Sequence, residues 1–379
     1  MSLMHALRDA LLPLGARLTR RGRGAADTLL IVQPDHLGDV LLAQPAVRRL
    51  RAAFPERRLV AVVGPWSARM AELSWPVDDV CTVVFPGFTR EEARGALDPY
   101  RQLFAEARVL APLAATDAVV LRPDAWWAAW LARSAVSGEV AGGADARARR
   151  FLTRVAAPDG GGHATQRACA IVAALTGAGT PPTPRSDPLQ LPDSEAAADA
   201  ARVLLQAAGV RDSYVVMHPG AGAEVKLWPA QRWRGVLVGL QREGLRVVVT
   251  GSEAESGLVD ELLNGLPGAV TLAGRTPLDV LIETLRGATL ALGPDCGPLH
   301  LAVATRTPTV HVFGPSDPAR YGPWGPAYNH RVVTAGWSCP RCGDLSPARP
   351  AGCGCLLAVG ADEVLAAALQ LLHGHAAAT

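Results

Sequence analysis

A chain of 379 residues with a formal net charge of +2 is too long for one ordinary core and too nearly neutral to suggest a nucleic-acid partner. Hydrophobic residues make up 49% and charged residues 19%, which is the balance of a globular α/β protein and excludes a disordered or fibrous one. No stretch approaches the roughly 20 apolar residues that span a bilayer, and the secretory cleavage pattern is absent, so we expect a cytoplasmic protein.

The first segment, residues 1–27, is basic and amphipathic. Its leucines recur at helical spacing beside arginines, and these leucines are Leu3, Leu7, Leu11, Leu14 and Leu18. The pattern is typical of a helix lying on the cytosolic face of the inner membrane, and equally of a terminal helix with a solvated basic end. Both interpretations stay open.

Residues 28–179 are expected to form a first α/β domain. Apolar runs at 28–34 and 58–65 flank a helical pattern at 38–55, and DAVVLRP at 117–123 is a later apolar run. Continuous apolar strands alternating with helices predict parallel strands covered on both faces. The predicted sheet is therefore doubly wound and Rossmann-like.

A proline-rich stretch, residues 180–195, is predicted to link this domain to a second one. Its five prolines exclude both a helix and a sheet interior. The alternation then restarts, so residues 196–379 predict a second Rossmann-like domain that ends in a closing helix at 361–373. We expect the fold class to be α/β, with two doubly wound domains facing each other across a cleft.

The turn GAGAEVKLWP holds Lys226, the only lysine among 37 Lys plus Arg. Gly220 and Gly222 allow a ligand to approach the backbone closely, and the following helix start favours an anion. Lysine offers a compact charge on a flexible stem, whereas the planar arginine fork requires more room. We therefore expect Lys226 to contact a diphosphate; the alternative is a solvated surface cation.

Two further turns of this domain carry polar groups at strand ends. GPDCGPLH places Asp295, the backbone N–H groups near Gly297, and His300 at a helix start, although a plain N-cap and a core histidine explain the same residues. In GSEAE, either Glu253 or Glu255 could accept from ribose hydroxyls, or could be an ordinary helix-start acid.

Asp39 follows Gly38 at the end of the first predicted strand, in QPDHLGD. A carboxylate opposite a phosphate-binding domain is what a general base for an acceptor hydroxyl requires. The same residue would also make an N-cap, and spacing alone does not separate the two roles.

Taken together, these turns resemble the family 9 glycosyltransferases, the family of the ADP-heptose:lipopolysaccharide heptosyltransferases. The resemblance runs from about Thr28 to the closing helix, and its motifs are LLIVQPDHLGDVLLAQPAV, HPGAGAEVKLWPAQRW and GPDCGPLHLAVATRTPTVHVFGPSDPARYGP. It implies a GT-B enzyme that inverts the anomeric centre in a single displacement without a catalytic metal. The N-terminal domain would hold the acceptor and the C-terminal domain the nucleotide sugar.

The resemblance also assigns residues. It implies that Asp39 is the general base, that Lys226 binds the donor phosphates and that Glu255 binds the ribose. The turn from Asp295 to His300 matches the backbone cradle for the diphosphate, with Cys296 where many relatives have Ser or Thr. On the acceptor side, Arg122 and His163 are loose matches.

Four of the seven cysteines lie in CPRCGDLSPARPAGCGC, at Cys339, Cys342, Cys353 and Cys355. The CPxCG turn is typical of a zinc knuckle, and a reducing cytosol favours metal binding over disulfides. We expect a structural zinc; an iron–sulfur cluster and reduced thiols in a loop are the alternatives.

The leading hypothesis is a membrane-associated glycosyltransferase that moves a heptose from an ADP-sugar to a lipid-linked or polysaccharide acceptor. A nucleotide-sugar epimerase on the same architecture would convert the donor alone. A non-catalytic nucleotide-binding module would show no turnover with any acceptor, and Asp39 and Lys226 argue against it.

Overall fold

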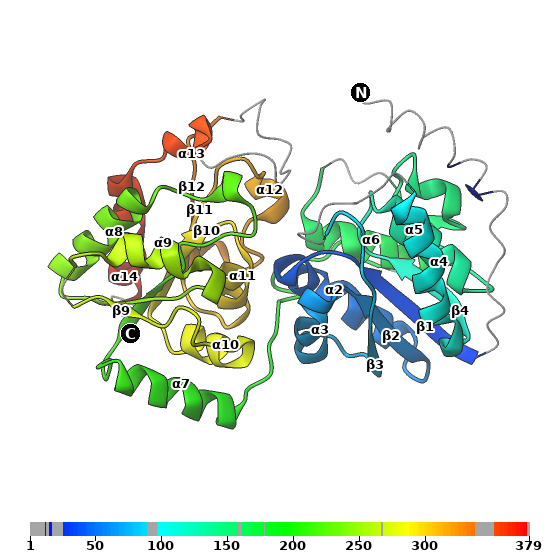
Figure 1. Cartoon of the computed structure of the whole chain (residues 1–379), viewed down its shortest axis with the longest axis horizontal. Helices are drawn as coiled ribbons and strands as arrows, with labels where there is room; N and C mark the ends of the chain where they lie inside the picture. The colour runs from blue at the N-terminus through cyan, green and yellow to red at the C-terminus, as the bar shows by residue number, and fades with distance from the viewer. Residues whose placement is uncertain are drawn as a thin grey trace. The chain divides into compact units, whose positions relative to one another are not determined.

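The computed structural model describes residues 12, 15–16, 26–88, 97–157, 161–177, 179–266, 268–337 and 352–376. The chain divides into two compact units, Met1–Thr183 and Pro184–Thr379. The division falls inside the proline-rich stretch 180–195. Figure 1 traces the whole chain.

The first unit is built on a parallel sheet with strand order β3-β2-β1-β4-β5-β6. Its central strands read TLLIV and LVAVV because both faces are covered, and these residues are buried almost completely. The strands are β1 (Ala26–Gln33), β2 (Arg58–Val63), β3 (Asp79–Thr82), β4 (Ala115–Val120), β5 (Val140–Gly142) and β6 (Arg154–Val155). The helices are α2 (Leu37–Ala53), η1 (Pro65–Ser67), α3 (Ala68–Ser74), α4 (Asp98–Leu110), η2 (Ala111–Leu113), α5 (Trp126–Ala135), η3 (Ala148–Phe151) and α6 (Ala164–Thr176).

The second unit repeats this topology, with strand order β12-β11-β10-β7-β8-β9. The strands are β7 (Tyr214–Met217), β8 (Arg246–Val249), β9 (Val270–Thr271), β10 (Leu290–Pro294), β11 (Thr309–Val312) and β12 (His330–Val333). The helices are α7 (Glu195–Ala207), η4 (Glu224–Lys226), α8 (Ala230–Arg242), η5 (Glu253–Glu255), α9 (Ser256–Leu263), α10 (Leu278–Arg286), α11 (Gly297–Ala304), α12 (Pro318–Tyr321), η6 (Ala327–Asn329), α13 (Gly354–Leu357) and α14 (Ala361–Ala376).

Each sheet reverses its strand order at one place, between β1 and β4 in the first unit and between β7 and β10 in the second. In doubly wound sheets this switch point opens a crevice at the carboxyl ends of the two strands, where ligands bind. The expected α/β class with two doubly wound sheets is confirmed. Ligands are therefore expected at the carboxyl ends of two strand pairs, β1 with β4 and β7 with β10.

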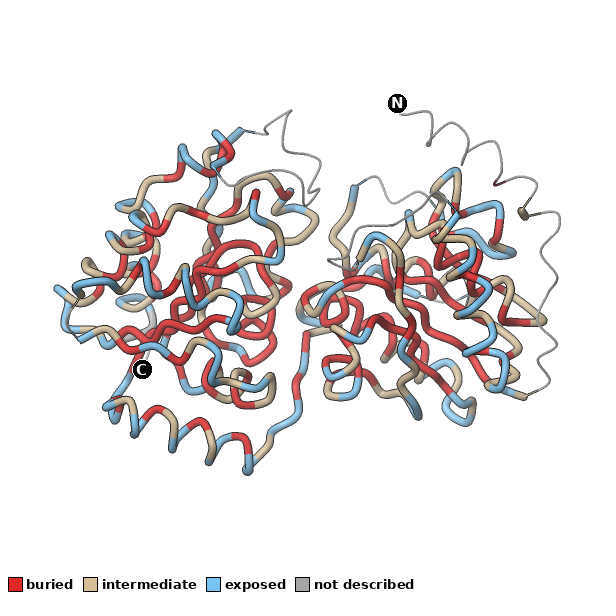
Figure 2. Tube along the Cα trace, in the orientation of Figure 1, coloured by how far each residue is buried: buried red, intermediate tan, exposed pale blue. Residues whose placement is uncertain are grey.

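Each unit has its own apolar core around its sheet, and Figure 2 shows the buried strands in red. In the second unit, Trp228 and Trp233 meet edge to face with ring centroids 4.7 Å apart. In the first, Trp130 stacks on Phe151 at 5.0 Å. In the described part of the chain, every helix is too short or too polar to cross a membrane.

Candidate functional site

The switch point of the second unit brings Lys226 and Asp295 together. Lys226 ends η4, in the turn that follows β7, and Asp295 comes directly after β10. Lys226 Nζ donates to Asp295 Oδ2 at 2.7 Å, and the two side chains are 19% and 6% exposed. The sole lysine is therefore held at the crevice and is not a freely solvated surface cation.

Asp295 is ionised at neutral pH. Burial alone would raise its pKa, but the charge of Lys226 and the nearby His300 imidazole outweigh burial and hold the pKa below its usual value. His300 Nε2 lies 3.7 Å from Asp295 Oδ1. The N-cap of α11 is Cys296, so Asp295 precedes the cap and is not the plain N-cap considered from sequence.

The start of α11 adds backbone donors beside this ion pair. Its first residue is Gly297, and Cys296 makes no side-chain capping bond. Burial raises the pKa of the Cys296 thiol, which therefore stays neutral and adds no charge to the crevice. Lys226 and the backbone N–H groups of Gly297 and Leu299 at the helix start can both face an anion; Pro298 between them has no N–H.

Glu255 lies against the glycine turn after β7. A Cβ on Gly220 would overlap the Glu255 carboxylate, so a larger residue there would require the Glu255 side chain to shift, whereas a Cβ on Gly222 would meet open space. Glu255 Oε2 also accepts from Ser252 N at 2.7 Å and from Ser252 Oγ at 2.8 Å, as a helix-start acid does. Glu253 is exposed. Of the two acids, the structure brings Glu255 to the turn.

His218 lies at the same carboxyl end of the strands and was not identified from the sequence. It is the first residue after β7, 6% exposed, and its Nδ1 is 3.1 Å from Thr250 Oγ1. Its Nε2 lies 3.9 Å from Glu255 Oε2. Burial lowers the pKa of His218 and Glu255 partly offsets this. The sequence signal that could have identified His218 is its position as a polar residue directly after a buried strand.

A buried polar cluster of Thr309, His311 and His330 lies behind His300. Thr309 Oγ1 is 2.8 Å from His311 Nε2 and 2.8 Å from His330 Nδ1. A hydroxyl has one proton, so one ring nitrogen accepts and the other must donate. The His300 and His311 rings lie 6.2 Å apart, which connects the cluster to the crevice.

Acid should destabilise this cluster. Burial, aided by the Arg331 charge, lowers the pKa of His330 from 6.5 to about 4. The unfolded chain therefore takes up the proton first, so stability is complete above pH 6.5 and is lost as the pH falls toward 4. For one histidine this loss is about 3 kcal/mol. His330→Asn should remove this part of the pH dependence of the unfolding free energy, as measured by urea unfolding across this pH range. A pH dependence in the variant equal to that of the wild type would contradict the assignment.

The switch point of the first unit gathers four charged side chains. Asp35 and Asp39 follow β1, while Arg122 and Asp124 follow β4. Arg122 donates to Asp35 Oδ1 and, from Nε at 2.7 Å, to Asp124 Oδ1. Its guanidinium lies 5.2 Å from the ring centre of Phe88.

Asp39 is the accessible carboxylate of this group. It is half-buried in the first turn of α2, whose N-cap is His36, so Asp39 is not the cap. Asp35 is 6% exposed at its side chain and bound by Arg122. Burial and the nearby Asp39 charge together raise the pKa of Asp35 to about 7, although Arg122 lowers it. The two carboxylates therefore interact, and only Asp39 can reach a ligand easily.

His163 has a structural explanation. It is the N-cap of α6, its Nδ1 accepts from Thr165 N at 3.2 Å, and Gln166 closes the capping box. Its contact with an acceptor stays a prediction.

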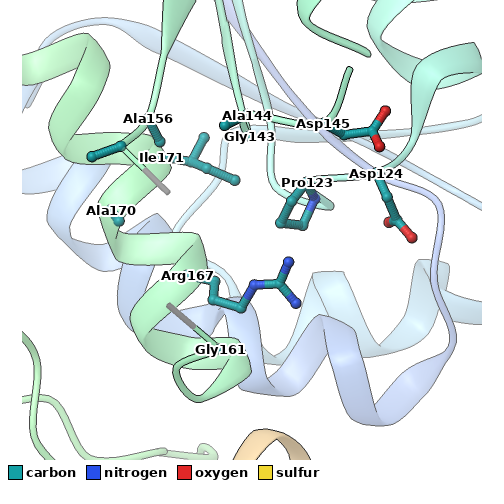
Figure 3. A pocket seen from close by; sticks show the side chains of 11 residues that line it. Pro123, Asp124, Gly143, Ala144, Asp145, Ala156, Gly161, Arg167, Ala170 and Ile171 are labelled. Carbon is teal, nitrogen blue, oxygen red and sulfur yellow. The ribbon is translucent and has the colours of Figure 1, made fainter. Parts of the chain in front are cut away.

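A pocket of about 420 Å³ lies at the carboxyl ends of β4, β5 and β6. Figure 3 shows Arg167 of α6 reaching toward Pro123 and Asp124 across it. Asp145 and Ile171 also line the pocket. The pocket therefore combines one arginine, two carboxylates and small apolar side chains, which suits a polyhydroxylated ring that has both donors and acceptors.

The cysteine cluster is described in part. Cys339 and Cys342 lie outside the described residues. Cys353 and Cys355 are buried with their sulfur atoms 3.1 Å apart; Cys353 is disulfide-bonded and Cys355 is a free thiol. In the described part of the chain, no group of three or more His, Cys, Asp or Glu could hold a metal.

Comparison with known proteins supports the resemblance seen in the sequence. Lipopolysaccharide heptosyltransferase 3 of Escherichia coli (strain K12) is 36% identical over 124 residues, which are 32% of this chain and 36% of that relative. The match thus spans about a third of that protein. Lipopolysaccharide heptosyltransferase 1 of Pseudomonas aeruginosa is 26% identical over 308 residues, 80% of this chain and 82% of the relative.

The fold agrees over nearly the whole chain. The solved structure of E. coli ADP-heptose lps heptosyltransferase II matches with a TM-score of 0.71 at 19% identity, covering 92% of this chain and 99% of that one. The model of glycosyltransferase family 9 (heptosyltransferase) matches residues 108–346. This match covers more than half of the chain, and the protein therefore belongs to glycosyltransferase family 9.

Proposed function

We propose that the protein transfers a heptose from an ADP-heptose donor to a hydroxyl group of a lipopolysaccharide-type glycan, with inversion. The observation that carries the proposal is the Lys226–Asp295 pair beside the start of α11, at the switch point of the second sheet in a family 9 chain. The similarity to lipopolysaccharide heptosyltransferases supports heptose as the transferred sugar, ADP as the nucleotide of the donor and lipopolysaccharide as the acceptor class.

The second unit would bind the donor. Lys226 and the N–H groups from Gly297 onward supply positive charge to the diphosphate, which becomes more negative as the glycosidic bond breaks. The ionised Asp295 orients the ammonium, and His300 supports Asp295. Glu255 lies on the Gly220 turn, where its carboxylate can accept from ribose hydroxyls.

The first unit would bind the acceptor. Asp39 takes the proton from the attacking hydroxyl, and the charged pocket around Arg167 and Asp124 holds sugar hydroxyls next to the same sheet edge. Arg122 is bound by Asp35 and Asp124, so we propose that it acts on the acceptor by fixing these carboxylates. A lipid-linked acceptor would place the reaction at the cytosolic face of the membrane.

Calorimetric titration with ADP, UDP and GDP tests the donor class. ADP should bind more tightly than the other two nucleotides to the wild-type chain. If all three fail to bind, the donor proposal is wrong. With labelled ADP-heptose, transfer that requires an added acceptor supports the transferase, whereas conversion of the donor alone would identify an epimerase. Binding without turnover on any acceptor would identify a binding module.

We also propose that the reduced cysteine cluster holds a structural zinc. Cys353 and Cys355 begin α13, are buried, and are close enough to share an ion once both are thiolates. Protein purified under reducing conditions should contain close to one zinc per chain, and Cys355→Ser should lower that content. Less than roughly a tenth of a zinc per chain would reject the site, since structural zinc binds tightly. Iron in its place would indicate the iron–sulfur alternative.

A further inference from the structure

Helix α4 presents apolar side chains on its solvent-facing side. Leu97, directly before the helix, is 58% exposed, Phe104 is 56% exposed and Val109 is 51% exposed. These are three of the nine large hydrophobic side chains exposed in the described residues, and they lie within thirteen positions of the chain. Scattered exposed hydrophobics need no explanation, but a group of them on one helix marks an interaction surface.

The same face is basic. Arg101 and Arg108 stand one turn before and one turn after Phe104, and both are exposed. The Arg101 side chain is 77% exposed and lies 3.7 Å from Asp98, which neutralises it only in part. Arginine can lay its aliphatic stem along an apolar surface and keep its charge in the headgroup layer. Leu97, Arg101, Phe104 and Arg108 are called the α4 face below; Val109 is five residues from Phe104 and therefore about 140° around the helix, at the border of this surface.

The opposite side of α4 is fixed in the first unit. Leu103 and Leu110 are completely buried in its core. Trp127 Nε1 donates to the Pro99 carbonyl at 2.7 Å, and Gln102 Nε2 donates to the Val84 carbonyl at 2.8 Å. The α4 face therefore rests on a rigid element and does not require the helix to detach.

The α4 face begins at the edge of the sheet where the candidate acceptor pocket lies. α4 precedes β4 and therefore runs antiparallel to it, so its N-terminus is at the strands' carboxyl ends. The bond from Trp127 to Pro99 joins the starts of α5 and α4 there, and Figure 1 shows the two helices side by side. α5 begins two residues after Asp124, which lines the pocket.

We propose that the α4 face docks the protein on an anionic lipid surface, with Phe104 and Leu97 among the acyl chains and with Arg101 and Arg108 at the phosphates. Interfacial helices combine these residue types in this way. The proposal rests on the proposed function only in that a lipid-linked acceptor explains the surface. Vesicle binding itself requires neither donor nor turnover.

Sedimentation of the full chain with lipid vesicles tests the proposal. The wild type should bind vesicles of phosphatidylcholine mixed with phosphatidylglycerol, and it should bind vesicles of phosphatidylcholine alone much more weakly. Arg101→Gln with Arg108→Gln should weaken binding to the anionic vesicles roughly 25-fold, because each arginine near such a surface contributes about fivefold. Phe104→Ser should weaken binding about tenfold. Added salt should weaken binding of the wild type more than that of the arginine variant.

The matched control is Val203→Ser with Arg202→Gln on α7, where Val203 is also 58% exposed and Arg202 is exposed. Its vesicle binding should equal that of the wild type. A loss of vesicle binding in the control as large as in the α4 variants would overturn the proposal. Full vesicle binding by both α4 variants would also overturn it and would assign the membrane contact to another part of the chain. Failure of the wild type to bind anionic vesicles would also overturn it.

Two further measurements keep the outcomes distinct. Light scattering that shows a dimer abolished by Phe104→Ser, together with no vesicle binding, would assign the α4 face to a second copy and overturn the proposal. ADP titration of the α4 variants should match the wild type. If the wild type binds vesicles and loses binding in the variants but does not bind ADP, the α4 face is retained and the donor proposal fails.

Discussion

Lys226→Ala is expected to lower kcat/KM about 10²- to 10³-fold and to weaken ADP binding, because it removes a preorganised positive charge from the leaving diphosphate. Lys226 Nζ donates to Asp295 Oδ2 at 2.7 Å, so the protein itself holds the charge in place and little reorganisation is needed during the reaction. Steady-state kinetics and calorimetric ADP titration measure the two effects. Arg286→Ala, which breaks an ion pair with Glu283 elsewhere in the same unit, is the control and should leave both unchanged.

The same substitution leaves Asp295 buried without its counter-charge. Breaking a buried ion pair by removing one partner costs about 3 kcal/mol of unfolding free energy. The double variant Lys226→Met with Asp295→Asn removes both charges and should recover most of this stability, but it should not recover ADP binding. Recovery of ADP binding in the double variant would show that Lys226 stabilises the fold and does not contact the nucleotide.

The candidate site at the switch point of the second sheet was largely predictable from sequence, because its residues follow buried strands. Asp295 and Lys226 come after runs of apolar residues that could only be central parallel strands, and the switch point then brings them together. The sequence could not separate Glu253 from Glu255. That choice depends on which carboxylate lies against Gly220, and three-dimensional packing alone decides it.

The charged group and the pocket at the carboxyl edge of the first sheet were harder to predict, because two of the strands there are short and the charges are paired across the sheet. β5 and β6 have three and two residues, too few for an apolar run to stand out. Arg122 was noticed, but its partners Asp35 and Asp124 were not. Asp35 lies 87 residues from Arg122 in sequence, so only the pairing of β1 with β4 shows that the two meet.

A comparison of the two carboxylates after β1 indicates which one can act as the base. Asp35 is nearly inaccessible and already binds Arg122, so an acceptor hydroxyl cannot reach it without breaking a buried pair. Asp39 is half-buried on the first turn of α2 and is fixed to a helix that begins at the strand end. The charge of Arg122 interacts with both carboxylates.

Asp39→Asn should therefore lower kcat about 10³-fold and leave the affinity for ADP unchanged, because general-base catalysis typically contributes 10²- to 10⁴-fold. Asparagine keeps the shape of the side chain but cannot accept the proton. Asp79→Asn, on an exposed carboxylate of β3, is the matched control and should retain full activity. A fall in kcat of less than about tenfold, or a parallel loss of ADP binding, would remove Asp39 from the role of base. Asp35→Asn and Asp124→Asn would then be the next variants to measure, since these carboxylates lie at the same switch point of the first sheet.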